Sequence, residues 1–382
     1  MPVTENDLAL DRELAQICGL LPLLRLVTPT NVTQARDQFF SGIDEPDFEY
    51  RELPELSDLR SRIDAINSQQ ADDPVIASLV EGLLESLKLR LRILANRGTD
   101  SFFLDSVELF GNVEDTILAL AQSILTSQQV SSPRHETVSA LEFAEAARSE
   151  IDLYRRSYPE MRAEVRVSET TPGVMVEGGN LYVGTETRIA RSRVVQLLQH
   201  EVGTHVVTFE NGLFQPLHIL SLGLANYDEL QEALGVVAEY LAGGLQFGRL
   251  RILAYRVVAA RMRSDGASFR ETFDALATYG CAGGTAFITT MRAYRAGGMT
   301  KDAIYLRGLV RLLDYISAGG DFERLYIGKI SFEAVPLIQE LCERGILTEP
   351  PLRPRFLDFK GASDRLKKLQ NGLTVLELGA SN

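Results

Sequence analysis

The stretch from Val194 to Asn211 contains the feature that most restricts how this chain can fold, a pair of histidines separated by five positions. It includes the hexapeptide HEVGTH, in which Glu201 stands between His200 and His205. On an ideal helix, residues four apart share a face, whereas residues five apart point well away from each other. The two histidines can therefore meet only on a distorted helix, at a π-bulge or a helix end, and Gly203 would ease either solution.

Two histidines with an adjacent glutamate are typical of a zinc site that activates water. HExxxH is one residue longer than the HExxH signature of zinc proteases. His200 and His205 would supply neutral nitrogen ligands, a third protein ligand would complete the site, and water would take the fourth position. Glu201 is then placed to take a proton from that water as it attacks a carbonyl. The motif thus predicts one zinc ion with Glu201 as general base.

The two remaining histidines do not fit this pattern. His218 lies in the apolar stretch PLHILSL, where we expect a core histidine or an outer partner of the site rather than a ligand. His135 is distant in the sequence, and we expect it at the surface.

Composition excludes several classes of function. The 382 residues include 39 basic and 52 acidic side chains, and the net charge of −13 argues against a nucleic-acid-binding surface. Cys18, Cys281 and Cys342 form no CxxC pair, so we expect neither a disulfide framework nor a thiolate zinc site, and a reducing cytoplasm fits best. The N-terminus lacks the pattern of a signal peptide, and no apolar run is long enough to predict a membrane span.

The periodicity predicts a mainly α protein with a small antiparallel β-sheet, an α+β fold. We expect an N-terminal helical region over residues 1–158, with a loop after Pro29, and a catalytic domain over residues 159–382. Between Ala163 and Val183 the alternation changes to that of strands, with a hairpin turn at Gly178-Gly179-Asn180. Such a sheet edge can hold a peptide in an extended conformation beside the zinc helix.

A zinc site with two histidines needs a third ligand, and YDELQEALGVVAEYL offers Glu229, Glu232 and Glu239. Glu232 has the other two within one or two helical turns, so it can be the ligand while a flanking acid supports a ligand histidine. The alternative is that all three are solvent-facing acids of an acidic protein. Spacing alone leaves both readings open.

Several longer segments resemble a known family. HEVGTH followed by NGLFQPLHILSLGLANYDELQEALGVVAEYL is similar to the tyrosine carboxypeptidase family, which includes the microtubule-associated tyrosine carboxypeptidases and the bacterial flavohaemoglobin expression-modulating QEGLA-motif proteins. The likeness continues in RGTDSFFLDSVELFGN, AFITTMRAYRAGGMTKDAIYLRGL and YIGKISFEAVPLIQELCERGIL, so it covers most of the chain.

The resemblance implies a zincin-like metallopeptidase core, with zinc held by His200, His205 and Glu232 and with Glu201 as the general base. The chain departs from the family in one place. Where the family typically reads QEGLA, this chain reads QEALG, so the glycine stands at 235 instead of 233. We expect this change to alter how closely the backbone packs there and the shape of the pocket.

A carboxypeptidase also needs a cation that binds the terminal carboxylate and a donor that stabilises the oxyanion. The candidates are Arg292, Arg295 and Lys301 for the carboxylate and Tyr305 for the oxyanion. The alternative is that these residues make structural salt bridges and core contacts.

The sequence therefore predicts a zinc metallopeptidase that removes a C-terminal residue, preferably aromatic, from a peptide or protein. One rival is a zinc-dependent hydrolase of a small amide, which a pocket closed at both ends would favour. Another is a non-catalytic regulatory protein that keeps zinc for stability. Glu201 argues against the last, because a closed structural site has no use for a base beside an open position.

Overall fold

Helices form most of the protein, as the sequence predicted. The computed structural model describes residues 3–67, 69–127, 136–169, 171 and 173–380, so His135 lies outside the described residues. The helices of the first half are α1 (Glu5–Leu20), α2 (Leu23–Val27), α3 (Val32–Phe40), α4 (Leu56–Asn67), α5 (Pro74–Ala95), α6 (Asp100–Phe110), α7 (Asp115–Thr126) and α8 (Ala140–Arg155).

The loop predicted after Pro29 was wrong in part, because it contains α3. Pro29 and Asn31 lie just before this helix, and Phe39 of α3 packs against an apolar partner far along the chain. Phe39 is fully buried and packs edge-on against Phe269 at a ring-centroid distance of 5.2 Å. A short helix of this kind is stabilised by long-range packing, so local periodicity does not reveal it.

The small sheet is mixed instead of purely antiparallel. Strands β2 (Val165–Ser168), β3 (Val174–Glu177) and β4 (Asn180–Gly184) are ordered β2-β4-β3. The predicted hairpin is confirmed: β3 and β4 are antiparallel, and Gly178 and Gly179 connect them with φ values of 55° and 77°. Strand β4 lies between β2 and β3, and it runs parallel to β2.

A second pair of strands and a series of helices complete the chain. Strand β1 (Thr137–Ser139) pairs antiparallel with β5 (Arg188–Ala190). The later helical elements are η1 (Arg191–Arg193), α9 (Val194–His200), η2 (Glu201–Val206), α10 (Val207–Phe214), α11 (Ile219–Leu222), α12 (Tyr227–Leu241), α13 (Phe247–Ser264), α14 (Phe269–Thr278), α15 (Gly283–Tyr294), η3 (Arg295–Gly297), η4 (Lys301–Ala303), α16 (Ile304–Ser317), η5 (Glu323–Tyr326), α17 (Val335–Glu343), η6 (Arg355–Asp358), α18 (Ala362–Gln370) and α19 (Val375–Ala380).

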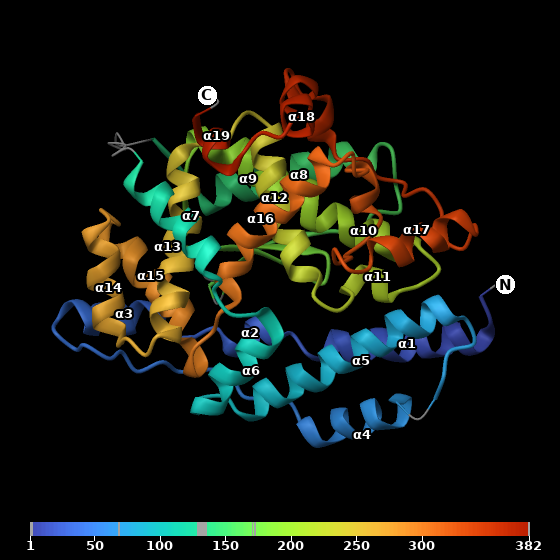
Figure 1. Ribbon diagram of the computed structural model, residues 1–382, viewed down its shortest axis with the longest axis horizontal. Coiled ribbons are helices and arrows are strands. Elements are labelled where there is room, and N and C mark those ends of the chain that lie inside the picture. The colour runs from blue at the N-terminus through green and yellow to red at the C-terminus, as the bar shows by residue number, and fades with distance from the viewer. Residues whose placement is uncertain (1–2, 68, 128–135, 170, 172, 381–382) are drawn as a thin grey trace.

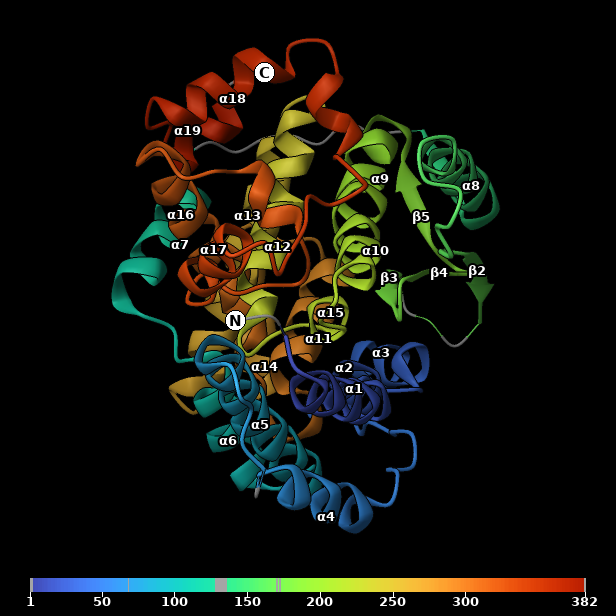
Figure 2. The same cartoon turned by 90° about the vertical axis from the view of Figure 1, so that its right-hand side faces the viewer.

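Helix α12 lies at the centre of this arrangement (Figure 1). It contacts α9, η2 and α16, and nearly all of its side chains from Glu229 to Leu241 are buried. A helix that is buried on every side belongs to the interior of a protein. The sheet lies between α8 and the helix that contains η2, so β3 borders the same region as the HEVGTH segment (Figure 2).

The first helices pack directly against this central part. Asp11 of α1 is fully buried, and its carboxylate accepts hydrogen bonds from the backbone N–H groups of His218 at 2.8 Å and Ile219 at 2.9 Å. One cluster of buried apolar side chains includes Leu10 as well as Val237. The division at residue 158 stays a prediction.

Two further expectations can be compared with the structure. His218 is exposed, so the prediction of a core or outer-partner histidine was wrong; its place before α11 leaves its side chain in solvent. Cys18, Cys281 and Cys342 are all free. Among the described helices, none is both long and apolar enough to cross a bilayer.

Replacing Asp11 by alanine should destabilise the protein by about 3 kcal/mol, because two backbone N–H groups, that of Ile219 buried, would lose their acceptor. Chemical denaturation measures this free energy of unfolding. Asp64→Ala, at an exposed position of α4, serves as the matched control and should change stability by less than about 0.5 kcal/mol. Equal stabilities of the two variants would show that Asp11 does not hold α1 to α11.

Candidate metal centre and pocket

A turn of π-helix brings the two motif histidines together. Between α9 and α10, η2 forms a π-helical turn within one continuous helical segment, which confirms the predicted distortion. The imidazole centroids of His200 and His205 are 5.0 Å apart. The hydroxyl of Thr204 donates to the carbonyl of Gln199, five residues earlier, at 3.1 Å and so supports the wider turn.

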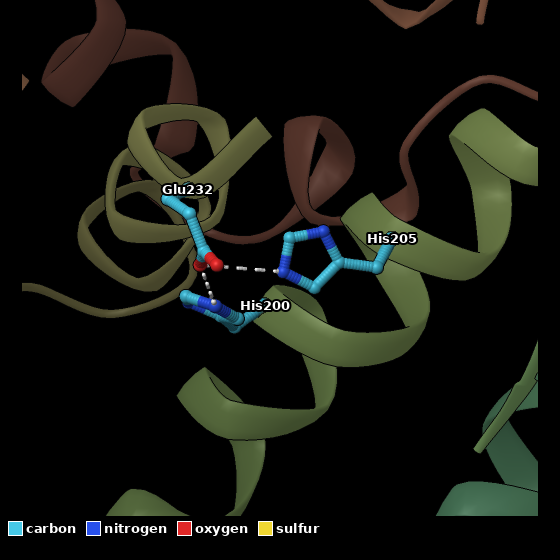
Figure 3. Close-up of side chains that lie close together, drawn as sticks. All are labelled: His200, His205 and Glu232. Carbon is cyan, nitrogen blue, oxygen red and sulfur yellow. Dashed lines mark ion pairs between the residues drawn. The ribbon is translucent and has the colours of Figure 1, made fainter. Parts of the chain in front are cut away.

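Glu232 of α12 faces both histidines (Figure 3). Its Oε2 atom lies 3.7 Å from Nε2 of His200 and 3.8 Å from Nε2 of His205. One ligand atom from each of the three residues falls within 4.8 Å of the others, so the group can hold a metal ion. Two imidazole nitrogens and one carboxylate oxygen are a donor set that suits zinc.

The other ring nitrogen of each histidine has its own partner. Nδ1 of His200 lies 2.9 Å from Oε1 of Glu239, and Nδ1 of His205 lies 3.4 Å from Oε1 of Gln231. Glu239 is in turn bound by Nε of Arg249 at 3.1 Å and by Nη2 of Arg193 at 3.1 Å. These contacts orient the rings so that both Nε2 atoms face Glu232.

The electrostatics of the group favour ligand-competent forms at two positions. Burial raises the pKa of Glu232, but Lys301 and His200 more than offset it, so the pKa lies well below its usual value. Burial, together with His200, lowers the pKa of His205 to about 4. Burial also lowers the pKa of His200, but Glu232 and Glu239 outweigh it and bring the value to about 9. A metal must therefore displace a proton from His200.

The glycine of the QEALG segment explains how α12 approaches the histidine. A Cβ atom at Gly235 would lie 2.5 Å from Cε1 and 2.7 Å from Nδ1 of His200. Only glycine therefore allows the imidazole to rest on the helix backbone as it does here. Ala233 of the same segment is fully buried.

The histidines and Glu232 line a pocket of about 590 Å³. Glu201 lines the same pocket and is buried. Burial raises the pKa of Glu201 and, with the nearby Glu232 and Glu239, outweighs the effect of His200, which brings the value to about 7. The carboxyl group of Glu201 can thus accept and release a proton near neutral pH.

Of the predicted carboxylate-binding residues, two already have anionic partners. Arg292 makes a bidentate ion pair with Asp302, with Nη2 to Oδ1 at 2.6 Å. Nζ of Lys301 lies 3.3 Å from Glu232 and 3.3 Å from Asp228. These two cations line the pocket, but their charges are balanced within the protein.

Arg295 differs from these cations. It is only 4% exposed, and its buried Nε atom has no hydrogen-bond partner among the residues that the structure describes. Burial and the neighbouring Arg292 lower its pKa to about 10, so it remains a cation at neutral pH. Tyr305, also in the pocket wall, has its pKa raised, chiefly by burial, and keeps its hydroxyl proton.

Sequence reasoning missed several residues of the pocket wall. Arg256 stacks on the Tyr305 ring at 4.6 Å, and Lys329 has its pKa lowered to about 8 by burial. Leu24 and Thr28 come from the first helices. No local pattern marks these residues, because they lie far from the motif in the sequence.

The flanking glutamates of α12 are buried, so the alternative of three solvent-facing acids was wrong. Glu239 contacts His200, as expected of a supporting acid. Glu229 instead pairs with Arg307 and with Arg311, which lies 3.0 Å from it.

This arrangement defines a class of protein in which a group that can hold a metal ion shares one pocket with a buried carboxylate. Residues 38–374 match the family model described as microtubule-associated tyrosine carboxypeptidase, and the chain belongs to this family. Microtubule-associated tyrosine carboxypeptidase 1 of mouse is 27% identical over 377 residues, which cover 94% of this chain and 70% of the mouse protein. The human protein of the same name is 26% identical over 389 residues, 96% of this chain and 72% of its own.

Gly235→Ala should weaken zinc binding by about tenfold or more, because the new methyl group must push the His200 ring away from its position. Competition with a chromophoric chelator measures the affinity without any assay of activity. Gly248→Ala is the control, since a Cβ atom there meets nothing within 4 Å. An unchanged zinc affinity in Gly235→Ala would mean that the ring contact has no bearing on the metal.

Proposed function

We propose that the chain is a zinc-dependent carboxypeptidase that acts on the C-terminus of a peptide or protein. The observation that carries this proposal is the meeting of His200, His205 and Glu232 in the pocket that also contains Glu201. When bound, zinc would supply a Lewis acid that polarises the scissile carbonyl and lowers the pKa of bound water.

Glu201 would move the proton in this reaction. As the general base it takes a proton from the attacking water, and as the acid it passes that proton to the leaving amine. Its buried position and raised pKa support this exchange. Tyr305, which stays protonated, would donate a hydrogen bond to the developing oxyanion.

The lining of the pocket supports a peptide substrate over a small amide. Residues 173–177, which include the edge strand β3, line the pocket beside the metal group. An edge strand offers unpaired backbone groups with which an extended peptide can form hydrogen bonds.

Arg295 would bind the terminal carboxylate. It is the predicted carboxylate-binding residue for which no ion pair with an acidic side chain is found among the described residues. A guanidinium group can bind a carboxylate through two parallel hydrogen bonds.

We propose that the substrate ends in an aromatic residue. Leu24, Ile288 and Met291 are apolar residues that line the same pocket as Arg295. The relatives are named for a tyrosine carboxypeptidase activity, which supports the same preference.

The free cysteines fit action in the cytoplasm.

Glu201→Gln should abolish release of C-terminal residues while zinc stays bound, because glutamine cannot take a proton from water. Mass spectrometry of a diverse peptide mixture, with zinc content measured in parallel, compares this variant with the native protein. Loss of single C-terminal residues with the native protein alone is the expected result. Equal peptide patterns from two zinc-loaded proteins would contradict the proposed peptidase.

Arg295→Lys should raise KM for a tyrosine-ending peptide about tenfold, because lysine keeps the charge but loses the paired donors. Steady-state kinetics measure the change. Arg36→Lys on α3, where the side chain is exposed, is the matched control and should behave as the native protein does. An unchanged KM in Arg295→Lys would mean that another cation binds the carboxylate, and Arg256 is the next candidate.

A further inference from the structure

The backbone next to Arg295 adopts an unusual conformation. Ala296 has φ 59° and ψ 12°, in the left-handed region that residues with a side chain rarely occupy. Gly297 and Gly298 follow with φ values of 113° and 117°. A conformation of this kind persists only where the surrounding structure holds it, and such residues cluster at ligand-binding sites.

The groups that hold this turn come from the N-terminal part of the chain. The hydroxyl of Tyr50 accepts a hydrogen bond from the N–H of Ala296 at 2.7 Å. The N–H of Gly98 donates to the carbonyl of Ala296 at 2.8 Å. The hydroxyl of Thr28 accepts a hydrogen bond from Nη1 of Arg295 at 3.2 Å. Both backbone groups of Ala296 and one guanidinium nitrogen are therefore fixed from more than 190 positions away in the sequence.

Arg97 connects these contacts to one another. Its Nη1 donates to the carbonyl of Leu26 at 3.1 Å and to that of Arg51 at 2.7 Å. Its guanidinium group also lies 5.4 Å from the centre of the Tyr50 ring. The end of α2, the segment at Tyr50 and the turn between α5 and α6 thus together support the turn at Ala296.

Other contacts of Arg295 leave room for a ligand. Its Nε atom has no hydrogen-bond partner in the described ranges of the chain, and the side chain lines the pocket together with Thr28. The nearby Asp302 is bound by Arg292 and lies 3.8 Å from Nε of Arg256. A buried arginine without an acidic partner is costly to the protein and suited to an incoming anion.

We propose that Tyr50 and Thr28 are positioning residues that aim Arg295 at the carboxylate of the substrate. The N-terminal helical region is then part of the substrate site, and its role extends beyond covering the metal centre. This inference rests on the proposed carboxypeptidase function. Tyr50 acts through the backbone of Ala296, and Thr28 acts on the guanidinium group itself.

Tyr50→Phe tests the proposal most directly, because it removes the acceptor hydroxyl and keeps the ring that contacts Arg97. KM for a tyrosine-ending peptide should rise about tenfold, while kcat changes less than about twofold, since misplacement of a binding group by about 1 Å is enough for such a loss. Thr28→Val should act in the same direction. Tyr315→Phe, near the C-terminal end of α16, is the matched control, because the hydroxyl of Tyr315 donates to the carbonyl of Asp321.

A double-mutant cycle separates positioning from general structural damage. If Tyr50 acts through Arg295, Tyr50→Phe should raise KM in the native background and leave it unchanged in the Arg295→Lys background. Equal increases in both backgrounds, or none in the native one, would overturn the inference while the carboxypeptidase itself stands. Failure of the native protein to release any C-terminal residue would instead overturn the proposed function, and this inference with it. Circular dichroism of each variant checks that it is folded.

Discussion

The meeting of the three candidate metal ligands depends on the close approach of α12 to the π-helical turn. Gly235 lets the His200 ring rest on the backbone of α12, and two glutamates of the same helix then reach the ring from either side. Glu232 faces Nε2, and Glu239, seven residues later, contacts Nδ1. Because seven residues span two helical turns, one helix supplies both a candidate ligand and the partner that orients another ligand.

Buried charge in this centre is balanced by cations from other elements. Lys301 of η4 lies beside Glu232, while Arg249 of α13 and Arg193 of η1 bind Glu239. Removing one member of such a pair leaves an uncompensated charge in the interior, which is strongly destabilising. The pairing thus keeps the candidate ligand and its supporting acid ionised, at the expense of making the site sensitive to changes in distant elements.

Arg295 stands outside this balance, and it connects the two halves of the chain. It lines the same pocket as the candidate metal ligands, yet its turn is held by residues that precede residue 100. The proposed activity and the proposed role of the N-terminal helices therefore meet at one side chain. Buried contacts such as that of Asp11 hold the first helices against the central part, where they can support the turn at Arg295.

The sequence by itself determined the local features, namely the distorted helix at HEVGTH, the turn at Gly178 and Gly179, and the placing of Glu232 and Glu239 on one face of a helix. These follow from spacing, because neighbours along a helix or hairpin are set by its period. Only the tertiary structure decided that the sheet is mixed, that Lys301 has acidic partners and that Arg295 forms no ion pair within the described part of the chain. Ion pairs and strand order join residues far apart in the chain, so they depend on how whole elements pack and not on any local pattern.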